Sequence, residues 1–357
     1  MKNLTNLLTL PGNGVFTVHT GAEKKEKILK AYYKTSNPEK ARQIWEKSLN
    51  ALKADKPLLI GIPSDNGGGI QRGANWGPLV LRQELMPELK NFTDMGDVRV
   101  IPHLLHDKYL NTDTIKMCQK ALYGKVNKLP VSPLSIAEAA LDEVYKDLPA
   151  ARILGLGGDH STSYPLVKAW LSSRKTKKKA ALLHFDAHTD LLDRRMGIDI
   201  CFGTWTYQIL KFLASKDHVV QIGVRSSGKD KKFWKKTLGV EQYWAHEVKK
   251  WGAEKTYKNL KAHYTKLGVE EIYISFDIDA LDMKFASATG TPEVEGLTPT
   301  DCAAIINMLA RDFKITGADM MEVAPFVSPE GVSESDRTSS LTVAGDMAKI
   351  LLRAMNS

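Results

Sequence analysis

The chain has 357 residues, of which 50 are Lys or Arg and 41 are Asp or Glu, so its formal net charge is +9 at pH 7. Its 43% hydrophobic and 25% charged residues are typical of globular proteins. No run approaches the ~18 apolar residues of a membrane helix, and residues 1–18 lack the pattern of a signal peptide. We therefore expect a cytoplasmic protein without a membrane partner.

Neither the cysteines nor the basic residues indicate a special class of protein. Cys118, Cys201 and Cys302 lie far apart and form no C-x-x-C pair, which argues against a disulfide framework and a zinc–thiolate site. The basic residues fall in short runs such as 174–179 and 229–236, and no nucleic-acid-binding motif accompanies them. We expect buried free thiols and no nucleic-acid partner.

Along the chain, two regions differ in composition. Residues 1–55 are polar and Lys-rich, with an irregular stretch at 11–14 and a helical pattern at 38–53, and we interpret them as an N-terminal extension. We expect residues 56–357 to form the main domain, in which short apolar runs alternate with segments of helical periodicity. Such alternation predicts an α/β fold, with helices on both faces of a mostly parallel sheet.

The predicted elements of this domain are short strands and longer helices. The strands are 58–62, 98–102, 152–156, 180–185, 219–223, 271–276 and 315–320. The helices are 78–89, 136–146, 164–172, 204–214, 254–267, 299–311 and 340–355. In a parallel sheet, functional side chains gather beyond the carboxyl ends of the strands.

Side chains able to bind a metal follow three of these strands. In two cases they occupy alternate positions, so they can face one side, and in the third a Gly-Gly turn presents a histidine. The six side chains are His160, Asp186, His188, Asp190, Asp277 and Asp279. Because the strand ends meet at one edge of the sheet, we expect these side chains to lie together.

Two histidines and four carboxylates, with no cysteine, suit divalent ions such as manganese, nickel, cobalt or iron. So many carboxylates need compensating cations, which favours two metal ions. A metal pair lowers the pKa of a bound water molecule, so the predicted reaction class is hydrolysis. Singly, each motif is also typical of an Asp that caps a turn, but the three in order favour a metal site. Residues 155–158 lack the Gly-Lys-Ser/Thr of a phosphate loop, which argues against a nucleotide site.

Over residues 57–355, the sequence resembles the ureohydrolase family, which includes arginase, agmatinase, guanidinobutyrase and formimidoglutamase. The resemblance rests on the three metal motifs and on the segments 60–63, 67–72, 73–78, 288–292 and 321–325. It implies a three-layer α/β/α fold and a homo-oligomer, a trimer or hexamer, which could also include a paralogous subunit.

The resemblance also implies two ligand sets that share Asp186 and Asp277 as bridging carboxylates. His160 and Asp190 would complete one set, and His188 and Asp279 would complete the other. Asp282, close to the last motif, is more typical of a turn.

Two acids receive catalytic roles from the same resemblance. Metal-activated water would attack a guanidinium carbon, Glu322 would bind the guanidinium nitrogens, and Asp190 would pass a proton to the departing amine. A carboxylate matches a planar guanidinium well, and the same charge would stabilise the tetrahedral intermediate. Otherwise Glu322 would be a solvated acid at a strand end.

The sequence departs from the family in one loop. Arginases and agmatinases usually carry a His-Gly pair after the second metal motif, and that histidine assists proton transfer. Here Phe202 takes the position, and no histidine lies between His188 and His218. General acid–base assistance is worth about 10² to 10⁴-fold, so its loss slows a reaction without abolishing it.

The groups with which arginases hold the substrate amino acid are also absent. Leu192 stands where an Asn is expected, and Ser226 and Ser227 replace acids. A site without partners for a charged end discriminates against that substrate, so we expect arginine to be poor. Phe202 and Trp205 would instead line an apolar pocket that binds a compact or alkylated guanidinium by cation–π contact. The alternative is that Trp205 packs in the core at a helix start.

The sequence therefore predicts a hydrolase that uses two Mn²⁺ or Ni²⁺ ions to cleave guanidine, an alkylguanidine or a biguanide such as metformin. The products would be urea or a substituted urea and an amine or ammonia. One alternative is an agmatinase or guanidinobutyrase. Another is a catalytically weak subunit of a hetero-oligomeric ureohydrolase. Formimidoglutamate is less favoured, because no Arg pair is placed for its carboxylates.

Overall fold

The computed structural model describes residues 3–14, 21–67, 71–327 and 333–357. Within these residues, nine strands form one sheet in the order β1-β3-β2-β4-β9-β8-β5-β6-β7. All neighbouring strands are parallel except β1 and β3. The strands are β1 Leu8–Thr9, β2 Leu58–Ile62, β3 Thr93–Val98, β4 Ile153–Gly157, β5 Ala180–Phe185, β6 Val219–Ile222, β7 Glu241–Tyr243, β8 Glu271–Asp277 and β9 Lys314–Met321.

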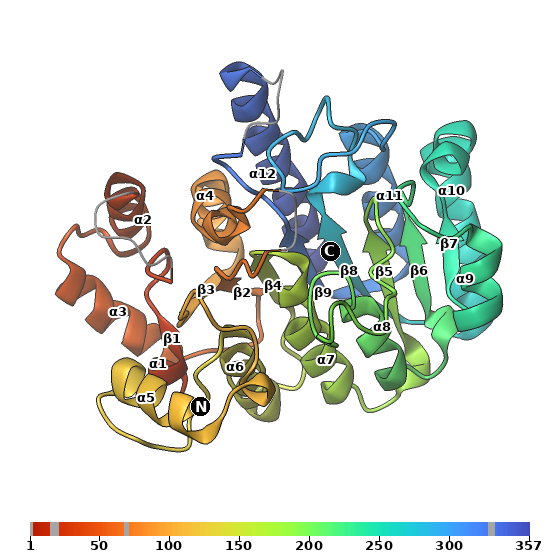
Figure 1. Cartoon of the computed structure of the whole chain (residues 1–357). Coiled ribbons are helices and arrows are strands. Elements are labelled where there is room, and N and C mark those ends of the chain that lie inside the picture. Colours follow the sequence, from red (N-terminus) through yellow and green to blue (C-terminus); the bar gives the residue numbers. More distant parts are fainter. Residues whose placement is uncertain (1–2, 15–20, 68–70, 328–332) are drawn as a thin grey trace.

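Helices cover both faces of this sheet (Figure 1). One layer contains α1 (Leu4–Leu7), α3 (Pro38–Asn50), α6 (Pro133–Asp147), α7 (Ser163–Ser173) and α8 (Trp205–Ile209). The other contains α4 (Gly77–Glu84), α10 (Ala245–Leu267), α11 (Pro299–Asp312) and α12 (Glu334–Asn356). The remaining α-helices of the described chain are α2 (Ala22–Tyr33), α5 (Thr112–Tyr123) and α9 (Lys231–Leu238).

Successive strand residues supply the two cores alternately. On β5, Leu182 packs into the core between the sheet and helices α6 and α7. Leu183 packs into the core on the other face, between the sheet and helices α11 and α12. Because strand side chains alternate between faces, a strand covered on both sides must be apolar throughout. The predicted three-layer α/β/α fold is confirmed.

Most predicted elements are present with shifted ends, and one strand was misplaced. The strand predicted at 98–102 is wrong: β3 runs over Thr93–Val98 and ends where the prediction began. Its two acids made the segment look unlike a buried strand. In the structure, Asp94 and Asp97 both pair with the fully buried guanidinium of Arg82, on α4. Buried charges of this kind are tolerated when they are paired.

Several helices also differ from the prediction. The segment 78–89 divides into α4 and a 3₁₀ helix at Met86–Asn91, and 204–214 divides into α8 and a 3₁₀ helix at Leu210–Phe212. Helix α10 begins before the predicted residue 254 and is interrupted at Gly252, whose φ of +73° is open to glycine. The elements β1, β7, α1, α2, α5 and α9 were not predicted.

The N-terminal residues pack on the edge of the same sheet. Strand β1 pairs with β3, and the Trp45 indole donates a hydrogen bond to the Met95 carbonyl at 3.0 Å. The backbone N–H groups of Gly12 and Gly14 donate to the Asp97 carboxylate at 2.8 and 3.1 Å. The boundary at residue 55 stays a prediction. Among the helices of the described chain, none has the length and apolar character needed to cross a bilayer.

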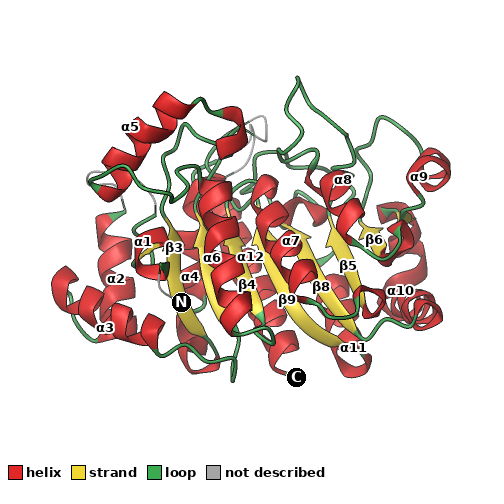
Figure 2. Ribbon diagram, turned by 90° about the horizontal axis from the view of Figure 1, so that it is seen from below, coloured by secondary structure: helices red, strands yellow, loops and turns green. Residues whose placement is uncertain are grey.

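Four adjacent strands in the middle of the sheet, β4, β9, β8 and β5, end at the same edge. Long loops gather there, beyond the strand ends (Figure 2). The predicted metal-binding motifs directly follow β4, β5 and β8, and Glu322 directly follows β9. The order of the strands therefore brings together segments more than 100 residues apart in the sequence.

Candidate metal centre

A tight turn after β4 places the first histidine. A Cβ at Gly158 would lie 1.7 Å from the Ser64 carbonyl oxygen, so only glycine fits this close approach. Asp159 then caps the 3₁₀ helix His160–Thr162, because its Oδ1 accepts a hydrogen bond from the Ser161 N–H at 2.9 Å. His160 is consequently fixed at the strand edge, with its side chain buried.

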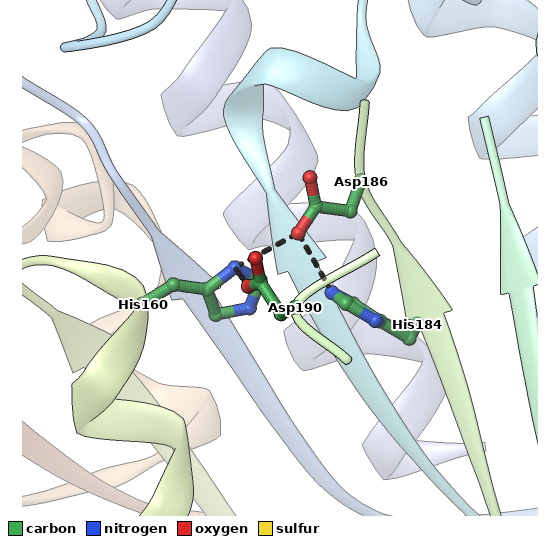
Figure 3. Close-up of side chains that lie close together, drawn as sticks. All are labelled: His160, His184, Asp186 and Asp190. Atoms are coloured by element: carbon green, nitrogen blue, oxygen red, sulfur yellow. Dashed lines mark hydrogen bonds and ion pairs between the residues drawn. The ribbon is translucent and has the colours of Figure 1, made fainter. Parts of the chain in front are cut away.

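The first cluster of ligand atoms surrounds Nδ1 of His160 (Figure 3). This nitrogen lies 3.1 Å from Oδ2 of Asp186, 3.3 Å from Oδ2 of Asp190 and 3.0 Å from Oδ2 of Asp277. Atoms bound to one ion at about 2.1 Å lie roughly 3 Å apart, so the spacing suits a shared metal.

A second cluster lies on the other side of Asp186. Nδ1 of His188 lies 3.3 Å from Oδ1 of Asp186 and 3.1 Å from Oδ2 of Asp279. Asp186 thus presents one carboxylate oxygen to each cluster, which is the geometry expected of a bridging ligand.

Asp277 is less clearly shared between the two clusters. Its Oδ2 faces His160, while its Oδ1 accepts a hydrogen bond from the Asp279 N–H at 2.8 Å. Asp277 is absent from the second group of described residues whose ligand atoms lie close together, which consists of Asp186, His188 and Asp279. Its bridging role therefore stays a prediction.

Sequence reasoning missed His184, which is completely buried on β5. Its Nε2 lies 2.9 Å from Oδ2 of Asp186, and the side chain belongs to the same close group as His160, Asp186 and Asp190. The signal was present, because His184 lies two residues before Asp186 and so shares its face.

The hydrogen bonds of His160 test whether the site suits a metal. Oγ of Ser275 donates to Oδ1 of Asp319 at 2.8 Å, so at 3.0 Å it accepts the proton of His160 Nε2. The lone pair of Nδ1 then faces the carboxylates. Within the described part of the chain, this buried nitrogen has no hydrogen-bond partner. An orphaned imidazole nitrogen facing three carboxylates fits a divalent metal ion.

The electrostatics of the cluster also favour bound cations. Burial, together with the charge of Asp186, raises the pKa of Asp190 well above its usual range. Burial and the neighbouring Asp279 carboxylate do the same for the pKa of Asp277. Burial would also raise the pKa of Asp186, but its close contacts with the surrounding histidines hold it well below its usual range. Carboxylates this close resist joint ionisation unless positive charge is added.

The two predicted catalytic acids share an unusual backbone conformation. Asp190 has a φ of +50° and Glu322 a φ of +61°, a region that non-glycine residues seldom adopt. Oε1 of Glu322 accepts a hydrogen bond from the His160 N–H at 2.8 Å. Burial and the charge of Asp277 raise the pKa of Glu322 well above its usual range. Strain of this kind concentrates at functional sites.

A cavity of about 890 Å³ opens onto both clusters. Its lining includes all six candidate ligands, Glu322 and the aromatic side chains Phe202, Tyr207, Phe233 and Trp234. The guanidinium carbon of Arg195 lies 4.5 Å from the ring centroid of Phe202, so one face of this ring is already covered. Phe202 thus lines the cavity next to a cation of the protein itself, and its role in substrate binding stays a prediction.

The prediction that Trp205 lines the substrate pocket needs correction. Its side chain is completely buried at the start of α8 and is absent from the described lining of the cavity. Its ring centroid lies 4.8 Å from that of His160, and its Nε1 donates to Oδ2 of Asp190 at 2.8 Å. A buried tryptophan usually donates its indole N–H to a hydrogen-bond acceptor, and here the acceptor is the buried carboxylate of Asp190. Trp205 therefore lies behind the candidate ligands.

Known proteins are similar to this chain over most of its length. The family model described as the arginase family matches residues 56–349. The chain is 31% identical to the mitochondrial guanidino acid hydrolase of Homo sapiens over 286 residues, which are 75% of this chain and 71% of that protein. It is 29% identical to the guanidinobutyrase of Pseudomonas aeruginosa, covering 78% of this chain and 80% of the relative. The solved structure of proclavaminate amidino hydrolase from Streptomyces clavuligerus matches with a TM-score of 0.64 at 24% identity, covering 85% of this chain and 93% of the other.

Of the Gly-rich segment 67–72, residues 68–70 lie outside the described residues.

Proposed function

Because the chain belongs to the arginase family of ureohydrolases, we propose that it hydrolyses a C–N bond of a small guanidino compound that lacks an α-amino acid group. The products would be urea or a substituted urea and an amine or ammonia. One observation carries the proposal: Asp186 presents an oxygen to each of two ligand clusters, and Glu322 lines the cavity beside them.

We propose that these clusters hold two divalent ions, Mn²⁺ or Ni²⁺. The ligands would be His160, Asp186, His188, Asp190, Asp277 and Asp279. When bound, such ions lower the pKa of a water molecule and so supply a nucleophile at neutral pH.

The protein's own groups would orient the substrate and move the proton. The Glu322 carboxylate would accept hydrogen bonds from the guanidinium nitrogens and hold the central carbon over the clusters. Oδ1 of Asp190 is free of the Trp205 hydrogen bond, which Oδ2 accepts. Asp190 would take a proton from the attacking water and give it to the departing nitrogen. The water oxygen then remains on the carbon, and the C–N bond breaks.

The first substrates we propose are guanidine and its N-alkyl derivatives, including biguanides. Phe202 occupies the place of the usual loop histidine, and Leu191, Leu192 and Tyr207 add apolar lining to the cavity. An uncharged N-substituent would lose little solvation there, whereas the amino acid end of arginine would lack partners.

A specific observation favours a guanidino acid as the second candidate. Arg195 and Lys229 both line the cavity, where the described acids outside the candidate clusters are Asp193 and the proposed guanidinium partner Glu322. Both cations lie over aromatic rings, and neither forms an ion pair with a described residue. They could hold the carboxylate of a substrate whose guanidinium binds Glu322. Two of the relatives carry names that describe activity on guanidino acids.

A substrate panel tests the proposal. Protein loaded with Mn²⁺ or with Ni²⁺ would be assayed for urea and amine release from guanidine, methylguanidine, metformin, 4-guanidinobutyrate, agmatine and arginine. We expect turnover of guanidine or an N-alkylguanidine and little of arginine. Preference for 4-guanidinobutyrate would support the second candidate. No turnover with two metals bound would contradict both and favour the catalytically weak subunit, which a paralogous chain would activate.

We further propose that the chain assembles as a homotrimer or homohexamer, as its family suggests. Light scattering of the purified protein would measure the mass, and a monomer would contradict the proposal.

A further inference from the structure

A row of buried polar side chains crosses three neighbouring strands beside the candidate centre. His184 on β5 pairs in register with Gln221 on β6, and Gln221 pairs in register with Gln242 on β7. All three side chains are buried. Because paired residues of parallel strands point to the same face, the three form one row. Polar side chains are costly in such a place unless they bond to one another.

Hydrogen bonds join this row from end to end. Nε1 of Trp244 donates to Oε1 of Gln242 at 3.0 Å, and Nε2 of Gln242 donates to Oε1 of Gln221 at 2.8 Å. Nε2 of Gln221 lies 2.9 Å from Nδ1 of His184. Nε2 of His184 in turn lies 2.9 Å from Oδ2 of Asp186.

The orientation of both glutamine amides is fixed by neighbouring groups that can act only as hydrogen-bond donors or only as acceptors. The Trp244 indole can only donate, so the oxygen of Gln242 must face it. The Thr189 carbonyl can only accept, and it lies 2.6 Å from Nε2 of Gln221, so the amino group of Gln221 must face inward. Two independent anchors therefore agree on the orientation of both amides.

This direction determines which nitrogen of His184 carries the proton. Because the Gln221 amino group donates to Nδ1, that nitrogen must be an acceptor, and the proton resides on Nε2. Thr206 Oγ1, which lies 3.4 Å from the same Nδ1, can rotate to donate as well. Nε2–H then donates to Asp186, the carboxylate that faces both clusters.

We propose that Trp244, Gln242 and Gln221 form a hydrogen-bond relay that holds His184 as its Nε2–H tautomer and thereby aligns Asp186 for metal binding. These residues are positioning residues, because none of them faces the cavity. The inference rests on the proposed function only in that Asp186 is the proposed shared ligand. Outer partners of metal ligands typically change metal affinity or activity by about 10 to 100-fold.

The tautomer is measured directly on metal-free protein with ¹⁵N-labelled histidine. In the wild type at neutral pH, we expect the His184 spectrum of a neutral ring protonated at Nε2. In Gln221→Glu, an acceptor faces Nδ1, so we expect a proton on Nδ1. A wild-type ring protonated at Nδ1, or an unchanged spectrum in the variant, would overturn the proposal. Activity plays no part in this readout, so the result stands apart from the proposed reaction.

Metal affinity provides the second test, by competition with a chelator. Gln221→Leu removes the donor to His184, and we expect affinity for Mn²⁺ to fall by about 10 to 100-fold. The matched control is Gln119→Leu. Gln119, on α5, is also buried, and its Nε2 donates a hydrogen bond to the Leu129 carbonyl at 2.9 Å. We expect no change in affinity in the control, and equal affinity in the two variants would overturn the relay.

A milder variant guards against misfolding of Gln221→Leu. Trp244 is only half-buried, so Trp244→Phe keeps the ring and removes only the outermost donor. We expect a smaller fall in metal affinity and in kcat, with little change in KM. An effect on KM alone would contradict the proposal. If the wild type hydrolyses no guanidino compound and the tautomer and affinity results hold, the relay stands and the proposed function fails.

Discussion

Trp205 and Asp190 are joined by a buried hydrogen bond in which the indole Nε1 donates to Oδ2 of the carboxylate at 2.8 Å. The same oxygen lies 3.3 Å from Nδ1 of His160, inside the first ligand cluster. Asp190 adopts a left-handed backbone conformation, with a φ of +50°, which non-glycine residues seldom adopt, although Asp does so more often than most. The indole therefore holds the carboxylate in a defined orientation at a strained position.

Replacing Trp205 with Phe tests this support. Trp205→Phe removes the donor and keeps an aromatic ring, so we expect kcat to fall by about 10 to 100-fold through misorientation of Asp190. Activity on the best substrate of the panel and metal content would both be measured.

The matched control for this variant is Trp170→Phe. Trp170, on α7, is also completely buried and donates a hydrogen bond to Oγ1 of Thr316, on β9, at 3.1 Å. Neither residue belongs to the described lining of the cavity. Similar losses of activity in both variants would show that Trp205 matters only for packing.

Loss of Asp277 should empty both clusters if this carboxylate bridges them. We expect Asp277→Asn to bind less than half an equivalent of metal, measured by mass spectrometry of the purified protein. Asp282→Asn is the control, because Asp282 lies five residues further on and its Oδ1 accepts a turn hydrogen bond from the Lys284 N–H. Two equivalents retained by Asp277→Asn would refute the bridging assignment.

The sequence predicted which candidate side chains lie together better than it predicted some of the strands that surround them. The six candidate ligands occupy alternate positions or a Gly-Gly turn at strand ends, and these are local patterns. By contrast, β3 was misplaced because Asp94 and Asp97 are tolerated only through their partner Arg82, which lies on another element. Local patterns cannot report such a pairing.

The polar row beside the site was missed for the same physical reason. Gln221 and Gln242 look like ordinary strand residues until the register of β5, β6 and β7 places them beside His184. Trp205 was assigned to the cavity from its place in the loop after the second metal motif, whereas its N–H bonds to a buried acid. Both errors concern partners distant in the sequence.

The charge of Glu322 should matter for substrate binding and much less for metal binding. Glu322→Gln keeps an oxygen that can accept from the His160 N–H but removes the negative charge beside the substrate cation. We expect kcat/KM to fall by about 10² to 10³-fold, as for loss of one preorganised electrostatic partner. Metal content should stay at the wild-type value, and loss of metal in this variant would contradict a role limited to substrate.

A variant of Arg195, a cation that lines the cavity, distinguishes the two candidate substrate classes. If Arg195 holds a substrate carboxylate, Arg195→Gln should raise KM for 4-guanidinobutyrate by about 10-fold, which corresponds to ~1.4 kcal/mol. KM for methylguanidine should not change. The control is Arg194→Gln, because the neighbouring Arg194 is exposed and absent from the described lining. An equal KM for the acid in wild type and Arg195→Gln would exclude this contact.

Asp199 ties the loop that carries Phe202 to the segment before α5. Its Oδ1 accepts a hydrogen bond from the Tyr109 hydroxyl and lies near Nζ of Lys108, both at 2.6 Å. Partial burial opposes ionisation, but the contacts with Lys108 and Tyr109 prevail and lower the pKa of Asp199 to about 2. Because the pKa is lower in the folded state than the ~3.9 of an unfolded chain, the charged group stabilises the fold.

The pH dependence of this stabilisation has a definite sign. It is fully present above about pH 4 and is lost as the pH falls through about 2, below which Asp199 is protonated in both states. Since the side chain is 36% exposed, solvent screening limits the effect to about 1 kcal/mol. Urea unfolding of metal-free wild type and Asp199→Asn should therefore differ by this amount at pH 6 and converge only below about pH 2. Tyr109→Phe, which removes one donor, should show part of the loss, and a difference that is constant across this range would assign the effect to packing.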